Sequence, residues 1–321
     1  MAARAGHGML DAGHDMPMLR ELLLTLSRSA GARDAAIHSR ILRPAVRRFV
    51  AGERLAEGVA AVRALNGAGI EATLDMLGEA TVSEDGARRA ARAYLEMLNA
   101  IFHGGLRAHV SLKLSQMGMD LSPDLAAELL EGIAHTAAGV GTFVRLDMED
   151  SGRLPSTLEI FDRVWDQGVR NAGIALQAYL YRTPQDVERY VSRGVRIRLC
   201  KGAYAEPAAV AYPRKTDVDA AYAALSERLL SSGIYHALAT HDEHLIEHAK
   251  AFAASSGIGR DRFEFQFLYG IRRDLQESLA ADGYRVRVYV PFGTHWYPYF
   301  MRRLAERPAN VLFLARHAIR R

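Results

Sequence analysis

A closed barrel of eight parallel strands, each followed by a helix, is the fold class that the sequence predicts. Short β-branched or apolar segments alternate along the chain with long segments rich in Ala, Leu, Glu and Arg. This alternation is typical of βα units and parallel strands. Eight such repeats cover roughly 250 residues, the size of a (β/α)8 barrel. The 321 residues also leave room for helices before the first strand.

The elements follow from the hydrophobic patterns and from the residues that begin and end helices. After the second strand, Ser122 is the expected N-cap of a helix and Pro123 its first residue. Thr183 and Pro184 are expected to begin a later helix in the same way, and Gly194 to end it. The eight expected strands are 71–77, 109–115, 142–149, 173–180, 195–202, 236–242, 262–270 and 285–293.

Three parts are expected along the chain. Residues 1–16 form a flexible leader without the apolar core of a signal peptide, 17–70 form helices that pack on the barrel, and 71–321 form the catalytic barrel. Together they make a single structural domain. No segment has the long apolar run that a membrane span needs. A cytoplasmic location is therefore expected.

Composition excludes several classes of protein. Hydrophobic residues make up 49% of the chain and charged residues 24%, which is typical of globular proteins. The single cysteine, Cys200, excludes a disulfide framework. The net charge is +4, but no basic block with interleaved aromatic residues indicates a nucleic-acid surface. The basic excess favours small anionic ligands or a loose association with an anionic membrane face.

Several expected strands alternate polar and apolar residues, whereas strands covered on both faces normally read as continuously apolar. If the apolar faces meet the outer helices, the barrel interior is lined by charges that must pair or hold a ligand. Arg145, Glu149, Arg196 and Glu264 are expected to neutralise one another in the lower layers. Barrel enzymes place their chemistry at the carboxyl ends of the strands. The polar residues expected there are Asp75, Lys113, Asp147, Gln177, Arg198, Lys201, His241 and Tyr289.

The common nucleotide motifs are missing, and two other chemistries stay open. No Gly-rich dinucleotide or phosphate loop follows a strand. His241, His244 and His248 have the spacing of metal ligands on a helix, but a strand-end histidine followed by a solvated helix is the favoured interpretation. A Schiff base on Lys113 or Lys201, as in aldolases or pyridoxal phosphate enzymes, is the alternative chemistry for an anionic small molecule.

The segment YFMRRLAERP near the end of the chain has two interpretations. Arg302 and Arg303 can lie on a solvated helix face, as surface arginines usually do. Alternatively, their planar donor groups, together with Tyr299, can form a clamp for a carboxylate or phosphate.

Eight motifs at the expected strand ends resemble the proline dehydrogenases. These are FAD-dependent enzymes with a distorted (β/α)8 barrel, and they include the proline-oxidising part of bifunctional proline utilisation proteins. The motifs occur in the family's order over about residues 45 to 315, as in the short monofunctional bacterial type. They are SLKLSQMG, VRLDMED, LQAYLYRT, IRLCKGAY, ATHD, FEFQFLYG, VRVYVPFGT and YFMRRLAE.

The resemblance implies how the substrate is held. It implies oxidation of L-proline to Δ1-pyrroline-5-carboxylate by hydride transfer to FAD, with the last barrel helix over the active site. Arg302 and Arg303 would grip the proline carboxylate, and Tyr299 would pack over the ring. Residues implied in catalysis are Arg198, Lys113, Asp147 and Tyr289. Residues implied in substrate binding are Lys113, Tyr204, Leu268, Tyr289, Tyr299, Arg302 and Arg303.

The resemblance also implies the cofactor contacts and the partners. Arg198 would lie near the reactive flavin nitrogen. Electrons would pass to a membrane quinone, which makes a peripheral membrane contact and a handover to a pyrroline-5-carboxylate dehydrogenase further expectations. His295 stands where relatives often have an acidic residue, which affects the loop over the site. Residues implied in FAD binding are Gln177, Arg198, Lys201, Gly202, Ala203, Thr240 and His241.

Overall fold

The computed structural model describes residues 25–26, 29, 31, 36 and 43–306. They fall into two compact units. One is Arg48–His295, and the other contains the described residues of Met1–Arg47 and Trp296–Arg321. The expected leader at 1–16 lies outside the described residues.

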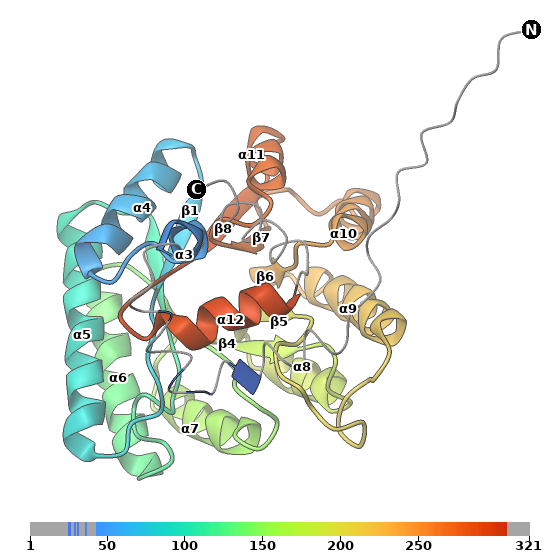
Figure 1. Ribbon diagram of the computed structural model, residues 1–321. Coiled ribbons are helices and arrows are strands. Elements are labelled where there is room, and N and C mark those ends of the chain that lie inside the picture. Colours follow the sequence, from blue (N-terminus) through green and yellow to red (C-terminus); the bar gives the residue numbers. More distant parts are fainter. Residues whose placement is uncertain (1–24, 27–28, 30, 32–35, 37–42, 307–321) are drawn as a thin grey trace, which may run out of the picture. The chain divides into compact units, whose positions relative to one another are not determined.

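The unit Arg48–His295 is built on a closed barrel of eight parallel strands in sequential order, with helices around it (Figure 1). All eight expected strands are present, so the predicted fold class is confirmed. Most strands end a few residues earlier than expected, because the polar residues of the motifs lie in the loops that follow. The strands are β1 (Glu71–Met76), β2 (Ala108–Leu112), β3 (Val144–Leu146), β4 (Ala172–Gln177), β5 (Arg196–Cys200), β6 (His236–Ala239), β7 (Phe263–Leu268) and β8 (Arg285–Phe292).

Helices alternate with these strands. The helix α3 (Arg43–Phe49) precedes the barrel, and α4 packs on β1 and β8. The helices of the barrel unit are α4 (Leu55–Gly67), α5 (Glu84–His103), α6 (Pro123–Gly139), α7 (Leu154–Asp166), α8 (Thr183–Ser192), α9 (Lys215–Leu230), α10 (Glu243–Ser255) and α11 (Arg273–Ala281). The other unit contains α12 (Trp296–Glu306). The expected place of this helix over the strand ends stays a prediction.

The two faces of the strands separate as the alternation predicts. Leu112, Val144 and Leu199 are completely buried and belong to the hydrophobic core between the strands and the outer helices. Residues next to them in sequence, such as Ser111 and Arg145, are buried inside the barrel with polar partners. Each fully buried leucine or valine contributes about 1.5–3 kcal/mol to the free energy of unfolding. The helix-facing side therefore stabilises the barrel and leaves its interior available for polar groups.

Two helix starts were predicted from the sequence, and the structure confirms one of them and contradicts the other. The Ser122 hydroxyl accepts a hydrogen bond from Leu125 N at 3.2 Å and caps α6, whose first residue is Pro123, as predicted. The prediction that Thr183 caps α8 is wrong, because the helix already begins at Thr183. The Thr183 hydroxyl instead donates to the carbonyl oxygen of Gln177 at 2.5 Å, which fastens the helix start to the end of β4.

The predicted mutual neutralisation of Arg145, Glu149, Arg196 and Glu264 is wrong in its pairing. Arg145 donates to the carbonyl oxygens of Ile174 and Arg196 at 3.1 and 2.6 Å, because it reaches across the neighbouring strands. Burial, together with the nearby charge of Arg198, lowers the pKa of Arg145 to about 9.

The carboxylates of that set have other partners as well. Glu264 accepts from Arg287 Nε at 3.0 Å and from the Tyr235 hydroxyl at 3.1 Å. Glu149 accepts from the Ser115 hydroxyl at 2.8 Å. The lower barrel layer is therefore held by a Glu264–Arg287 pair and by arginine contacts with backbone carbonyls.

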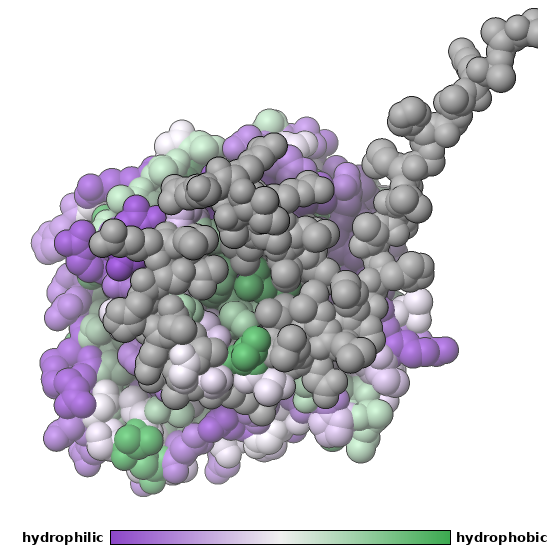
Figure 2. All heavy atoms as spheres, viewed as in Figure 1, coloured by the Kyte–Doolittle hydropathy of each residue, from purple (hydrophilic) through white to green (hydrophobic). Residues whose placement is uncertain are grey.

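The surface of the described residues is mainly polar where the outer helices lie (Figure 2). Among the described residues, no helix combines the length and the apolar character needed to cross a membrane.

Candidate active site

A carboxylate just after β3 joins three strands of the barrel, β2, β5 and β8. Asp147 accepts hydrogen bonds from the Ser111 hydroxyl at 2.6 Å, from Arg198 Nη1 at 2.5 Å and from the Tyr289 hydroxyl at 2.7 Å. Burial pushes the pKa of Asp147 upward, but the charges of Arg198 and Lys113 and these hydrogen bonds hold it below its ordinary value. Asp147 is therefore an ionised anchor rather than a proton acceptor.

Lys113 lies between two carboxylates. Its Nζ is 3.8 Å from Asp75 Oδ1 and 3.9 Å from Asp147 Oδ2. The Lys113 side chain is 17% exposed and that of Asp75 is 0% exposed, so the ammonium group is the accessible member of this pair. Burial raises the pKa of Asp75 above its ordinary value, while Lys113 opposes the shift. The two carboxylates thus differ in their electrostatic environment.

Arg198 has donors left over after its contacts with the protein. Its Nη1 binds Asp147, and its guanidinium group lies 5.5 Å from the centre of the Tyr289 ring. Its Nε and Nη2 are buried, and no acceptor for them occurs among the described residues. Buried donors normally have acceptors. The arrangement is therefore suited to an acceptor supplied by a ligand.

The loop after β5 is fixed against the end of β4. Ala203 N donates to Gln177 Oε1 at 3.1 Å, and Gln177 Nε2 donates to the Glu149 carbonyl oxygen at 3.0 Å. Gly202 has φ +146°, and a Cβ added there would lie 2.5 Å from the Tyr179 ring. Glycine is required at this position because the backbone approaches the ring so closely. The exposed Gly202–Ala203 segment is a backbone edge on which a planar ligand can rest.

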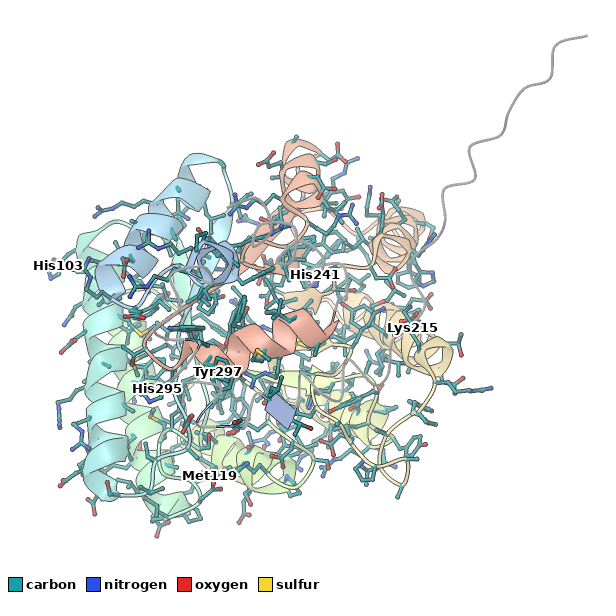
Figure 3. All side chains as sticks on the ribbon, viewed as in Figure 1. His103, Met119, Lys215, His241, His295 and Tyr297 are labelled. Carbon is teal, nitrogen blue, oxygen red and sulfur yellow. The ribbon has the colours of Figure 1, made fainter. Side chains whose placement is uncertain are left out.

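Lys201 belongs to a cluster of four charges outside this centre. Its Nζ donates to Asp219 Oδ1 at 2.5 Å and to Asp242 Oδ2 at 2.8 Å. Lys215, labelled at the start of α9 in Figure 3, bonds to Asp219 as well. Like Lys113, Lys201 contacts carboxylates and not an apolar pocket, so the contacts of neither lysine favour the Schiff-base alternative.

His241, labelled in Figure 3, follows β6 and contacts the end of β7 through Leu268. Its Nε2 accepts a hydrogen bond from Leu268 N at 3.0 Å, which leaves the proton of the neutral ring on Nδ1. His248 binds Glu227 at 2.7 Å instead of joining His241. The part of the chain that the structure describes contains no group of three or more His, Cys, Asp or Glu residues placed to hold a metal ion.

Three of the predicted substrate-binding residues lie on α12, in the other unit. Arg303 is 7% exposed, and its guanidinium group is 5.1 Å from the centre of the Tyr299 ring, one turn earlier in the helix. Arg302 is half-buried. The solvated-face interpretation is therefore wrong for Arg303. That these residues reach the strand ends stays a prediction.

Comparison with known proteins assigns the family. The sequence profile described as proline dehydrogenase matches residues 59–316. This chain belongs to the proline dehydrogenase family. Proline dehydrogenase of Deinococcus radiodurans is 45% identical over 83% of this chain and 87% of its own length. Proline dehydrogenase 1 of Bacillus subtilis strain 168 is 41% identical over 95% of this chain and 100% of its own length.

Larger relatives contain this proline dehydrogenase unit as one part. The bifunctional protein PutA of Escherichia coli strain K12 is 30% identical over 84% of this chain, which corresponds to 24% of the PutA length. The crystal structure of proline utilization A from Bdellovibrio bacteriovorus, inactivated by N-propargylglycine, is similar with a TM-score of 0.78 and 25% identity. The similarity covers 90% of this chain and 36% of that one. The fold observed here is therefore similar to the fold of that part of proline utilization A.

The structure adds two residues to the site. Asp75 was expected at a strand end without a role, and Ser111 was not among the expected site residues. Ser111 bridges Asp147 and Arg145, and Asp75 faces Lys113. The available signal was the two-residue period of a strand, which places Ser111 on the same face as Lys113 and Asp75 on the same face as Thr73. Which strands become neighbours decides the partners, and spacing within one strand does not carry that information.

Proposed function

We propose that this protein oxidises L-proline to Δ1-pyrroline-5-carboxylate with FAD as its cofactor. Membership of the proline dehydrogenase family supports the reaction. The observation that carries the proposal is the environment of Arg198 in the barrel. Asp147 orients Arg198 and also contacts the accessible Lys113, and two buried donors of Arg198 are left for a ligand.

The residues at the strand ends fit a flavin. The open Nε and Nη2 of Arg198 would donate to it, and the backbone edge at Gly202 and Ala203 would support it. When bound, FAD supplies the group that accepts the hydride from the substrate. Gln177 would act by holding Ala203, since its amide already bonds to that loop. The remaining proposed cofactor contacts are Lys201, Thr240 and His241.

The substrate would be held by its carboxylate. Lys113 supplies one positive group from the barrel, and we assign Arg302 and Arg303 the bidentate contacts. Fixing the carboxylate determines which ring carbon reacts, and such positioning lowers the barrier without a further chemical group. Asp147 would keep Arg198 and Tyr289 in place. The proposed walls of the ring pocket are Tyr204, Leu268, Tyr289 and Tyr299.

The proposal also covers the electron acceptor, the location of the protein in the cell and the fate of the product. A quinone would reoxidise the flavin, with a cytoplasmic protein touching the inner face of the membrane peripherally. The product would pass to a pyrroline-5-carboxylate dehydrogenase. Residues 71–321 would form the catalytic barrel, with the helices of 17–70 packed on it.

The test is a visible absorption spectrum of the purified protein, recorded before and after anaerobic addition of L-proline. Flavin bands that bleach with L-proline, and stay unchanged with buffer alone, are the expected result. A protein that does not take up FAD, or whose flavin is not reduced, would overturn the proposal. Borohydride trapping of a substrate on Lys113 or Lys201 would then support the Schiff-base alternative.

A further inference from the structure

The charged group around Asp147 has too little net charge for an anion-binding site. Its two cations are Lys113 and Arg198, and its two carboxylates are Asp75 and Asp147. With both carboxylates ionised, this group of four has no net charge to offer to a substrate carboxylate. One proton on either carboxylate restores a net charge of +1.

Asp147 is poorly placed to take that proton. Ser111 and Arg198 donate to Oδ1, and Tyr289 donates to Oδ2. Protonation would lose at least one of these hydrogen bonds, and charge-assisted bonds are the strong ones. Asp147 therefore stays ionised and remains the counter-ion of Arg198.

Asp75 has the opposite environment. It is 0% exposed, and neither carboxyl oxygen accepts a hydrogen bond within the described part of the chain. Tyr289 is close enough to influence its pKa, but the hydroxyl hydrogen of Tyr289 is donated to Asp147. The only cation at ion-pair distance from Asp75 is Lys113, at 3.8 Å, as far as the described residues go. A buried carboxylate with so little support is easily neutralised by a proton.

The charged groups around Asp75 make its protonation depend on Lys113. Lys113 follows β2, and the other groups that face Asp75 are Asp147 after β3, Arg198 from β5, Tyr289 from β8 and Tyr94 from α5. Burial raises the pKa of Asp75 and Asp147 raises it further, while Lys113 and Arg198 lower it. A substrate carboxylate that binds Lys113 competes for this counter-ion and adds a negative charge nearby. Both effects favour the neutral form of Asp75.

We propose that Asp75 is a proton-linked positioning residue, which takes up a proton when a carboxylate binds at Lys113. The inference rests on the proposed function, because it takes the substrate carboxylate to be the anion at Lys113. Asp75 does not touch the substrate and acts through the ammonium group of Lys113. Anion affinity and pH are thereby coupled: binding tightens as the pH falls and Asp75 becomes neutral.

The test uses the purified flavin-containing protein and cyclopentanecarboxylate, which has the ring and the carboxylate but no amine proton to release. Calorimetric titration in buffers with different ionisation enthalpies measures the protons exchanged on binding. Uptake approaching one proton is expected between the pKa of Asp75 in the free protein and its higher pKa in the complex, and in this range affinity falls by up to about tenfold per pH unit. Asp75→Asn should bind at the tight limit without uptake at any of these pH values.

A matched control is Asp217→Asn, because Asp217, in the first turn of α9, forms its ion pair with the exposed Arg214. It should take up protons like the unaltered protein. Infrared spectroscopy of the unaltered protein gives a second readout that requires no variant. Binding should produce the carbonyl stretch of a protonated carboxylic acid, which ionised carboxylates lack.

The outcomes separate this inference from the proposed function. Binding without proton uptake, or uptake that persists in Asp75→Asn, would overturn the role of Asp75. Absence of cyclopentanecarboxylate binding in a protein whose flavin L-proline reduces would overturn it as well. Failure of L-proline to reduce the flavin would instead overturn the proposed function.

Discussion

The Tyr289 hydroxyl donates a hydrogen bond to Asp147 Oδ2 at 2.7 Å, although the two residues are 142 positions apart in the sequence. This contact crosses the barrel interior from β8 to the end of β3. Arg198 binds the other oxygen of the same carboxylate and lies over the Tyr289 ring. Tyr289, Asp147 and Arg198 therefore position one another.

Tyr289→Phe tests this arrangement. The change removes one hydrogen bond to an ionised group, and such bonds contribute about 1.5–3 kcal/mol. We expect kcat/KM for L-proline to fall about tenfold to hundredfold, because Asp147 and Arg198 lose their fixed orientation. Steady-state kinetics measure the effect, with the exposed Tyr181→Phe as control. Equal activity in both variants would show that the hydroxyl does not position the site.

Gly202→Ala tests the backbone edge after β5. A methyl group at this position would lie 2.5 Å from the Tyr179 ring, so the loop must move. We expect the protein to fold but to retain less than about a tenth of its flavin, because the displaced Ala203 no longer supports it. The flavin-to-protein absorbance ratio is the measurement. Gly132→Ala is the control, since an added Cβ there meets nothing within 4 Å; full flavin content in Gly202→Ala would contradict the prediction.

Arg302→Ala and Arg303→Ala test the assignment of α12 to substrate binding. Loss of a charge-assisted contact with the substrate carboxylate should raise KM for L-proline by about tenfold or more, while flavin content stays unchanged. The control is Arg214→Ala, which removes an exposed arginine that pairs with Asp217. Normal KM values in both α12 variants would refute the clamp. Loss of flavin with normal KM would place these arginines at the cofactor instead.

The protonation of His236, which is buried at the start of β6, makes the stability of the barrel depend on pH in the acid range. Its Nδ1 accepts a hydrogen bond from Ile197 N at 3.0 Å, and Nε2 lies 2.9 Å from the Ser232 hydroxyl. Burial, together with the charge of Arg145, lowers the pKa of His236 from 6.5 to about 3. The unfolded chain therefore binds a proton more readily than the folded protein. The resulting stability is present above pH 6.5 and is lost as the pH falls toward 3.

We expect His236→Asn to be less stable at neutral pH but less sensitive to acid. The lower pKa of His236 in the folded protein accounts for at most about 5 kcal/mol of the change in the free energy of unfolding between pH 6.5 and pH 3. Tm measured from pH 7 to pH 4 should fall less steeply in His236→Asn than in the unaltered protein. The exposed His135→Asn should keep the original slope. An unchanged slope in His236→Asn would mean that other groups carry the acid sensitivity.

The sequence by itself determined the barrel and the composition of its interior. Eight segments with helices between them define the fold class, and the strict alternation of polar and apolar residues separates the helix-facing side of the strands from the inside. Both features depend on neighbours within a few positions of the chain, where the periods of strands and helices act. The motifs also located Lys113, Asp147, Arg198 and Tyr289 at the strand ends.

Only the tertiary structure decided which of these charges meet. From the sequence, Glu264 was expected to be neutralised by Arg145 and Arg196, whereas the closed barrel brings it to Arg287. No role was assigned to Asp75 from the sequence, although this carboxylate on β1 lies 3.8 Å from the ammonium group of Lys113, which follows the adjacent strand β2. Such pairings depend on strand register and barrel closure, which join residues far apart in the chain. Burial then separates the two carboxylates, because hydrogen-bond donors reach Asp147, whereas within the described residues Asp75 accepts no hydrogen bond and has Lys113 as its ion-pair partner.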